Sequence, residues 1–349
     1  MNTLYLDLHV LQTVPPSCIN RDDTGSPKTA IYGGVTRARV SSQAWKHAMR
    51  NMFSDIFSQD QIGVRSKNII DLIAEELEKI GYQGNREKKS CEALKNAGIK
   101  LNKENKTDAL FFMSRKQAKK LAELISTDEE DKNAYKSALS EYPSIDIALF
   151  GRMVASDPSL NYDAAAQVAH SISTHEVRNE YDYFTAVDDL SETDNAGAGH
   201  LGTVEFHSAT LYRYATVNVY ELKQYLGTET PQAVLGFVKA FLLSMPTGKQ
   251  NTFANRTAPD FAYITLRKDQ PVNLAGAFEK PVYSEGGYSD KSVQALAAYA
   301  QKVYHSFVET PETSYCVGQE VDGLGEEVSI GQLFEVLKEC VAEYCEEEM

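Results

Sequence analysis

Residues 31–52 read IYGGVTRARVSSQAWKHAMRNM, and this stretch decides the predicted fold. The glycine pair at 33–34 permits a turn, and residues 35–40 are rich enough in β-branched side chains to form a strand. Ser41 and Ser42 then offer a helix N-cap. The apolar residues that follow recur at helical spacing: Trp45, Ala48, Met49, Met52, Phe53 and Ile56. We therefore expect a strand that leads directly into a helix.

The polar side of the same stretch is basic. No acidic residue lies between Asp23 and Asp55, whereas five cations do: Lys28, Arg37, Arg39, Lys46 and Arg50. The two strand arginines are two positions apart and so share one face of the strand. An unpaired basic set beside a helix N-terminus favours phosphate binding. The alternative is a solvated amphipathic helix whose cations pair with acids from elsewhere in the chain.

The composition is that of a folded soluble protein. The chain has 349 residues, 42% of them hydrophobic and 24% charged, which allows one large domain with insertions or two domains. Its net charge is −14, but residues 309–349 contain twelve acids against Lys338 alone, or −11, which leaves −3 for the rest. Because the acid is concentrated there, the total charge does not exclude nucleic acid as a partner.

Targeting and redox signals are weak. The first residues lack the basic and apolar regions of a signal peptide, and no apolar run approaches the length of a membrane span. The five cysteines at 18, 91, 316, 340 and 345 are scattered, which argues against disulfides and a zinc site. We expect a cytoplasmic protein that does not contact a membrane.

Periodicity along the chain predicts a mixed α+β fold. We expect strands at 4–11, 35–40, 145–150, 210–220 and 261–266, and helices at 42–56, 163–170, 231–244, 291–308 and 330–344. Residues 57–142 show helical spacing and many lysines, which indicates a helical insertion. Aromatic residues at 181–187 and glycines at 196–202 indicate a projecting hairpin. Without the insertions, the order is the ferredoxin-like βαββαβ plan that RNA-recognition modules share.

Signals for catalysis are poor. Gly248 and Lys249 lack the remainder of a phosphate-binding-loop motif, although Lys249 can hold a phosphate as a point charge. His170 and His175 can be metal ligands, but structural histidines are the more frequent case. Asp22 and the following Asp23 can bind a divalent ion that cleaves a phosphodiester, or they can cap a turn. We expect no catalytic residue, metal or cofactor, and no enzyme activity.

Several motifs in one order carry a family resemblance. They are NRDD at 20–23, GG at 33–34 with RARVSSQ at 37–43, DIAL at 146–149 with GRM at 151–153, FTAVDDL at 184–190 and HLGT at 200–203. Together they closely resemble the CasC-type backbone subunit of the type I-E CRISPR surveillance complex, Cascade. The resemblance extends from the first strand through AGAFEK at 275–280, so it covers most of the chain.

The resemblance implies an RRM-like palm with a helical finger insertion and a thumb β-hairpin insertion. The palm would comprise residues 1–56, 143–180 and 203–349, the finger 57–142 and the thumb 181–202. Copies would stack along CRISPR RNA, hold its phosphates, and kink it at intervals to display the spacer for target DNA. The other partners would be the large, small, guide-end-capping and guide-processing subunits. The alternatives are a metal-dependent RNA-guided endoribonuclease that uses Asp22 or Asp23, and a protein-only scaffold.

Combining the basic stretch with the resemblance gives a set of RNA-binding residues. Some would hold phosphates, Met153 would wedge among the bases, and the hairpin tip would reach across the RNA of a neighbouring copy. The full set is Arg21, Arg37, Arg39, Ser41, Gln43, Lys46, Arg50, Met153, Tyr183, Phe184, Thr185, Val187, Lys249 and Gln250. A protein that presents any spacer cannot read base edges, so phosphate contacts and apolar wedges suit the task. Base pairing would then supply the specificity.

Overall fold

The computed structural model describes residues 3–185 and 201–347. They divide into two compact units. Unit 1 contains residues 1–49, 168–216 and 238–336, and unit 2 contains residues 50–167, 217–237 and 337–349. The fold is mixed α+β, and it is organised around one large mixed sheet in the described residues.

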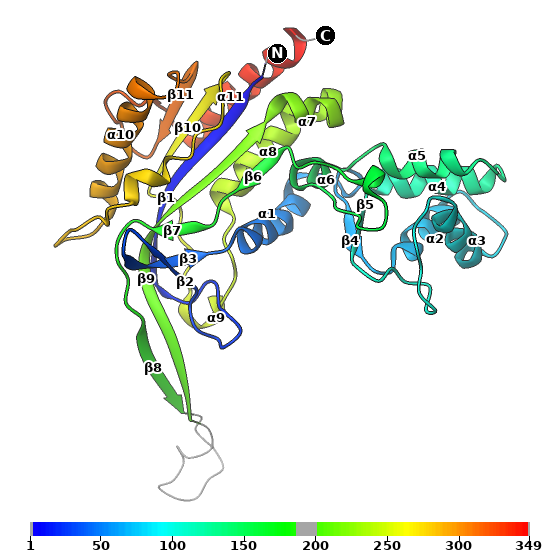
Figure 1. The fold of residues 1–349 in the computed structure, drawn as a ribbon, viewed down its shortest axis with the longest axis horizontal. Helices are drawn as coiled ribbons and strands as arrows, with labels where there is room; N and C mark the ends of the chain where they lie inside the picture. The colour runs from blue at the N-terminus through cyan, green and yellow to red at the C-terminus, as the bar shows by residue number, and fades with distance from the viewer. Residues whose placement is uncertain (1–2, 186–200, 348–349) are drawn as a thin grey trace, which may run out of the picture. The chain divides into compact units, whose positions relative to one another are not determined.

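The main path of the large sheet follows the order β12-β11-β10-β1-β9-β7-β3-β2. Its strands are β1 (Tyr5–Ser17), β2 (Thr29–Tyr32), β3 (Val35–Val40), β7 (Ser171–Ser173), β9 (Leu201–Asn218), β10 (Phe261–Arg267), β11 (Thr313–Val317) and β12 (Glu326–Glu327). β8 (Glu180–Thr185) pairs antiparallel with the first part of β9, and this hairpin extends away from the rest of the sheet (Figure 1). The predicted strands at 4–11, 35–40, 210–220 and 261–266 are therefore present.

β1 is buried on both faces, whereas the sequence predicted a half-buried strand that ends before the prolines at 15–16. Leu6 and Leu8 are buried on one face, and the polar Asp7 and His9 are buried on the other. The polar face packs beneath α10 (Ser289–Ser306) and the short 3-10 helix η4 (Leu274–Phe278). His9 is opposite Tyr263 in the antiparallel register with β10. A second layer of helix therefore covers the face that alternation assigned to solvent.

α1 (Ser42–Ile56) begins where the sequence predicts. Ser41 Oγ accepts the Ala44 N–H at 3.3 Å, as an N-cap does. Trp45 is buried against the guanidinium of Arg213, which lies 3.8 Å from the indole centroid. Arg213 also donates to Gln12 Oε1 at 2.6 Å. The end of α8 (Thr230–Leu243) supplies Phe241, whose ring lies 4.7 Å from the same guanidinium.

Unit 2 is mainly helical. Its helices include α2 (Ile69–Lys79), α3 (Arg86–Asn96), α4 (Arg115–Ser126), α5 (Lys132–Ser140), α6 (Ile145–Phe150) and α7 (Val219–Leu226), and β4 (Val64–Ser66) pairs with β5 (Phe111–Met113). Ile73, Leu94 and Leu121 belong to one buried cluster that joins α2, α3 and α4. Figure 1 shows these helices packed together. The lysines of this region are mostly at the surface, and Lys89 pairs with Asp128 at 3.5 Å. These surface lysines agree with the expected solvated face of the helical insertion.

The remaining elements are short or terminal. They are η1 (Gln59–Gln61), η2 (Pro158–Leu160), β6 (Ala166–Val168), η3 (Gly227–Glu229), α9 (Gln250–Phe253) and α11 (Ile330–Glu347). In the described parts of the chain, no helix combines the length and apolarity that a bilayer crossing requires.

Two predicted elements are wrong. Residues 145–150 form helix α6 rather than a strand, and residues 163–170 contain β6 rather than a helix. In α6 the polar Asp146 is as buried as its neighbours Ile145 and Ile147. Its buried carboxylate therefore produced an apolar–polar alternation that resembles a strand with one solvated face.

Candidate nucleic-acid interface

Two loops of unit 1 lie against each other at Gly248. A Cβ on Gly248 would lie 2.3 Å from the Ile19 carbonyl oxygen, so the loop that carries Lys249 packs directly on the loop that carries Arg21. An open depression of about 530 Å³ forms there. Its lining is Ile19, Asn20, Arg21, Asp22, Asp23, Thr24, Gly25 and Gly248. Close packing of the two backbones thus brings cations together from positions more than two hundred residues apart.

Asp22 shapes the first of these loops. Its Oδ1 accepts the Thr24 N–H at 3.0 Å, the Thr24 hydroxyl at 2.7 Å and the Ser26 N–H at 3.0 Å. The Thr24 hydroxyl is the main reason that the pKa of Asp22 lies below its ordinary value. Asp22 therefore fills the turn-capping role. Across the described residues, no group of three His, Cys, Asp or Glu side chains is placed to hold a metal ion.

Arg21 lines this depression, and Lys249 directly follows Gly248, which also lines it. Arg21 is exposed and Lys249 is half-buried, and neither has a carboxylate within ion-pair distance in the described residues. Lys249 has a left-handed backbone, with φ of 51°, immediately before α9. Gln250 is exposed in the first position of α9. The structure therefore brings Arg21, Lys249 and Gln250 of the predicted set to one surface of unit 1.

The start of α1 joins this surface through Asn20. Asn20 Oδ1 accepts the Ser41 N–H at 2.9 Å, which fixes the helix N-terminus to the Arg21 loop. Ser41 itself is buried, and its hydroxyl oxygen caps the helix, so its main role is structural. Gln43 is exposed on the first turn, and Lys46 is half-buried one turn later. Burial lowers the pKa of Lys46.

The two strand arginines both donate hydrogen bonds to backbone carbonyls, but they differ in burial. Arg37 is completely buried, and it donates to the carbonyls of Tyr32, Ser173 and Phe278 at 3.2, 2.9 and 2.8 Å. It has no route to a phosphate, so its predicted RNA contact is wrong. Arg39 is half-buried; it donates to the Thr29 carbonyl at 3.1 Å and contacts His170. Of the two arginines on the shared strand face, only Arg39 is partly exposed, and its RNA contact stays a prediction.

Arg50, in unit 2, is also engaged. Its Nε donates to Asp146 Oδ2 at 3.2 Å, and its guanidinium lies 4.6 Å from the ring centroid of Phe112. The Asp146 side chain is only 2% exposed. Arg50 therefore pairs with a distant acid, as the alternative interpretation of the basic helix expects, and its phosphate contact stays a prediction.

The hairpin of β8 and β9 presents aromatic side chains to solvent. Tyr181 and Tyr183 are 66% and 72% exposed, and Phe184 is 44% exposed beside Gly202. Thr185 is exposed at the end of β8, and Val187 lies outside the described residues. The base of the hairpin contacts α9, because the ring centroids of Phe206 and Phe253 are 5.8 Å apart. The predicted hairpin is therefore present, and Tyr181, Tyr183 and Phe184 are exposed on it.

Met153, in unit 2, is 85% exposed, more than any other large hydrophobic side chain among the described residues. The residue two positions before it, Gly151, has a φ of 77°, and a Cβ there would lie 2.9 Å from the Tyr162 carbonyl oxygen. The next residue, Arg152, is buried. A tightly built turn thus presents an unbranched apolar side chain to solvent.

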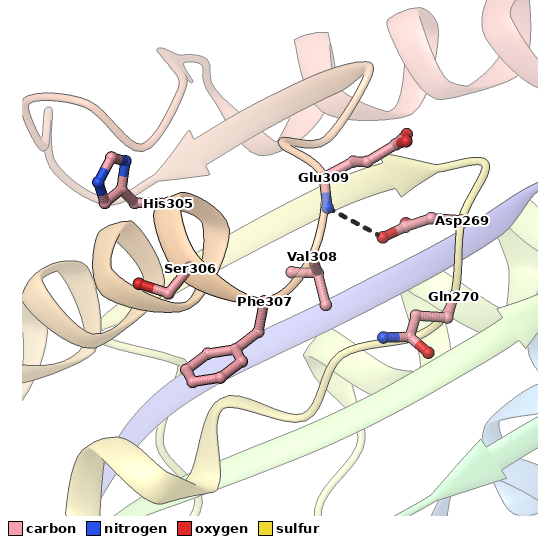
Figure 2. A pocket seen from close by; sticks show the side chains of 7 residues that line it. All are labelled: Asp269, Gln270, His305, Ser306, Phe307, Val308 and Glu309. Atoms are coloured by element: carbon pink, nitrogen blue, oxygen red, sulfur yellow. Dashed lines mark hydrogen bonds between the residues drawn. The ribbon is translucent and has the colours of Figure 1, made fainter.

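Two further features of unit 1 are His175 and a hollow at its surface. His175 is buried, its Nε2 accepts the Thr210 N–H at 3.1 Å, and its ring stacks on Tyr288, so it is a structural histidine. A hollow of about 470 Å³ is lined by Asp269, Gln270, His305, Ser306, Phe307, Val308 and Glu309 (Figure 2). There Asp269 pairs with Arg267 at 2.8 Å and accepts the Glu309 N–H. None of the predicted site residues lines this hollow.

Sequence patterns missed two residues that support the candidate surfaces, one in each unit. Asn20 joins the Arg21 loop to α1, and Arg152 anchors the turn before Met153. Both lie inside the quoted motifs, but a motif does not say which of its members touch a ligand. A basic residue between Gly151 and an apolar residue was the available signal, and it could not distinguish a buried arginine from an exposed one.

Comparisons with known proteins agree over nearly the whole chain. The chain is 33% identical to one in a solved structure described as "CRISPR RNA-guided surveillance complex, pre-nicking", with a TM-score of 0.82 over 97% of this chain and 100% of that chain. A second, described as "CRISPR RNA-guided surveillance complex", is 30% identical, with a TM-score of 0.65 over 96% and 99%. No curated protein matches. The family model described as CT1975-like protein matches residues 6–342, and the chain therefore belongs to that family.

Proposed function

We propose that this chain is a non-catalytic backbone subunit of a type I-E Cascade complex. Copies of it would assemble along CRISPR RNA, hold the phosphates, and displace bases at intervals so that the spacer can pair with target DNA. The other Cascade subunits would be its further partners. Full-length similarity to chains of two CRISPR RNA-guided surveillance complexes supports this role.

The observation that carries the proposal is a hairpin with exposed aromatic side chains whose base contacts the short helix after Lys249, a cation with no carboxylate within ion-pair distance in the described residues. Tyr183 is 72% exposed on a hairpin whose base packs on α9, and α9 directly follows Lys249. Exposed aromatic groups next to cations suit single-stranded nucleic acid, because every base offers a stacking face and every nucleotide a phosphate. Met153 adds a second exposed apolar group, at 85%.

The strand order supports an RRM-like palm within this proposal. If β7 takes the place of the incorrectly predicted strand at 145–150, the chain order becomes β1, α1, β7, β9, α8, β10. In the sheet these strands lie as β10-β1-β9-β7, an arrangement in which the first and third strands of a βαββαβ unit are central. The helices α2–α5 would then be the finger and the β8–β9 hairpin the thumb.

A salt series on guide RNA tests the phosphate contacts. Replacing Arg21 and Lys249 together by alanine removes two cations, so the slope of log affinity against log salt should become shallower by about 1.4. The matched control replaces Lys100 and Lys103 by alanine, because both are exposed lysines of unit 2 outside the proposed surface. An unchanged slope in the first variant, or an equal change in the control, would contradict the proposal.

The second candidate is an RNA-guided endoribonuclease, because Asp22 and Asp23 line the same depression as Arg21. The hydrogen bonds that Asp22 Oδ1 accepts from Thr24 and Ser26 weigh against a metal-binding role for it. Complementary RNA incubated with the assembled complex and magnesium should stay intact. Regularly spaced cuts that disappear in Asp23→Ala would favour the nuclease. A protein-only scaffold would instead be indicated if the assembled complex purifies without RNA.

A further inference from the structure

A frame of hydrogen bonds holds the backbone on both sides of Met153. Arg152 and Tyr162 exchange two backbone N–H···O bonds of 3.0 and 2.9 Å. On the other side, the Val154 N–H donates to Asn161 Oδ1 at 2.6 Å, and the Val154 side chain is buried. Met153 is thus the outward residue between two fixed neighbours.

The guanidinium of Arg152 connects this frame to the helical core of unit 2. Nε and Nη2 donate to the Leu160 carbonyl at 3.0 and 2.7 Å. Nη2 also donates to the Leu139 carbonyl at 2.7 Å, and Nη1 donates to the Phe112 carbonyl at 3.1 Å and to Gln117 Oε1 at 3.2 Å. All five N–H donors of the guanidinium are therefore used, on β5, α4, α5 and η2.

This arrangement is costly for a residue that serves packing alone. Arg152 is only 5% exposed, and in the described residues no carboxylate lies within ion-pair distance of it. The rings of Phe111 and Tyr162 each lie 4.9 Å from its guanidinium carbon. Burial lowers the pKa of Arg152 to about 10, so the side chain stays protonated at neutral pH. A buried charge without an acid requires full hydrogen bonding, and an apolar residue would avoid that demand.

We propose that Arg152 is the positioning residue that fixes Met153 as a base-displacing side chain and couples it to the helical core of unit 2. This inference rests on the proposed function. A side chain that enters a base stack loses less conformational freedom on binding when its backbone is already fixed. Without the guanidinium, the turn at Met153 loses its links to three separate carbonyls, and the wedge loses its fixed direction.

Fluorescence of the guide can test this positioning role. In the complex assembled with its partner subunits, 2-aminopurine placed along the guide reports each displaced base by increased emission. Met153→Ala should abolish the increased emission at the guide positions where Met153 displaces a base, which tests the wedge itself. Arg152→Lys keeps the charge but has one nitrogen in place of three, so it should reduce the same signal at least threefold, and the double variant should lose no more than Met153→Ala. Guide affinity should stay within twofold of the wild type.

Matched variants separate positioning from general destabilisation. Arg213→Lys alters an equally buried arginine of unit 1 and should lower the melting temperature while leaving the 2-aminopurine signal intact. Asn161→Ala removes the acceptor of the Val154 N–H, costs less stability and should reduce the signal in part. If Arg152→Lys does not fold, Asn161→Ala becomes the test of the positioning role. A full signal in Arg152→Lys or Asn161→Ala, with signal lost in Met153→Ala, overturns the inference alone. A full signal in Met153→Ala overturns the proposed wedge.

Discussion

The arginines of this chain include two contrasting classes, those that are buried and those that are exposed. Arg37, Arg152 and Arg213 are buried and bind mainly carbonyl oxygens, whereas Arg21 is exposed at a loop. A buried guanidinium cannot release counterions from RNA, so only the exposed class contributes to salt-dependent binding. The electrostatics of the interface therefore depend on few residues, each of which can be removed with little risk to the core.

Asp7 is a buried acid whose ionisation costs stability. Burial raises the pKa of Asp7 to about 6, against the hydrogen bonds from Tyr214 and the Val272 N–H. The folded state therefore binds more protons than the unfolded state between about pH 4 and 6, and the Asp7 contribution to stability falls as pH rises through that window. The free energy of unfolding of Asp7→Asn, minus that of the wild type, should therefore increase by up to roughly 3 kcal/mol from pH 4 to pH 7.

Urea unfolding of both proteins at a series of pH values measures this difference. Comparing the two proteins matters because burial lowers the pKa of the adjacent His9 to about 3, which makes the stability contribution of His9 rise with pH over a similar range. The His9 contribution is common to both proteins and largely cancels in their difference. A stability difference that is constant with pH would show that Asp7 ionises as freely in the folded chain as in the unfolded one.

At the level of elements, local sequence patterns correctly predicted helices and strands that have one apolar face. The β3–α1 transition, β9, α8 and the aromatic hairpin follow from alternation, helical spacing and an N-cap serine. The same patterns gave a wrong prediction for α6, because Asp146 is buried in an ion pair with Arg50, almost a hundred residues earlier. The partners of Arg37 and Arg152 are likewise carbonyls from distant segments. No local pattern encodes such contacts, so the predicted set of RNA-binding residues included arginines that the structure buries or pairs within the chain.

The docking of two loops at Gly248 predicts an effect of a single methyl group. Gly248→Ala would place a Cβ 2.3 Å from the Ile19 carbonyl oxygen, so the loops that carry Arg21 and Lys249 must move apart. We expect guide affinity to fall roughly three- to tenfold, because the cost of such overpacking is typically about 1–3 kcal/mol and part of it displaces the cations. Filter binding at fixed low salt measures the loss.

Gly286→Ala is the matched control, because a Cβ at Gly286 would meet nothing within 4 Å and its backbone is not left-handed. It should bind guide RNA as the wild type does. Equal affinity for the Gly248 variant would mean that the two loops do not act together on one strand.

On the scale of the whole chain, the proposed attraction for RNA must be local. The net charge is −14, and most of the excess lies in residues 309–349, which include β11, β12 and α11. At 0.1 M salt, charges separated by more than about 10 Å are largely screened, so the cations at Arg21 and Lys249 can act despite the acidic remainder. At low salt the acidic residues are screened less, and they oppose binding of RNA at surfaces outside the interface.

Assembly along a guide predicts that the number of bound copies grows with RNA length. Each copy would cover a fixed stretch of phosphates, and the exposed hairpin of one copy, with Tyr183 and Phe184, would be covered only when a neighbour is bound. Native mass spectrometry of the chain with RNAs of increasing length should show stepwise increases in copy number. Unrelated sequences of equal length should give the same steps, because phosphate and stacking contacts do not read bases. Replacing Tyr183 and Phe184 together by alanine should leave single copies able to bind but remove the preference for adjacent ones. A copy number that stays constant while the RNA lengthens would exclude a backbone role, whatever the affinity of the first copy.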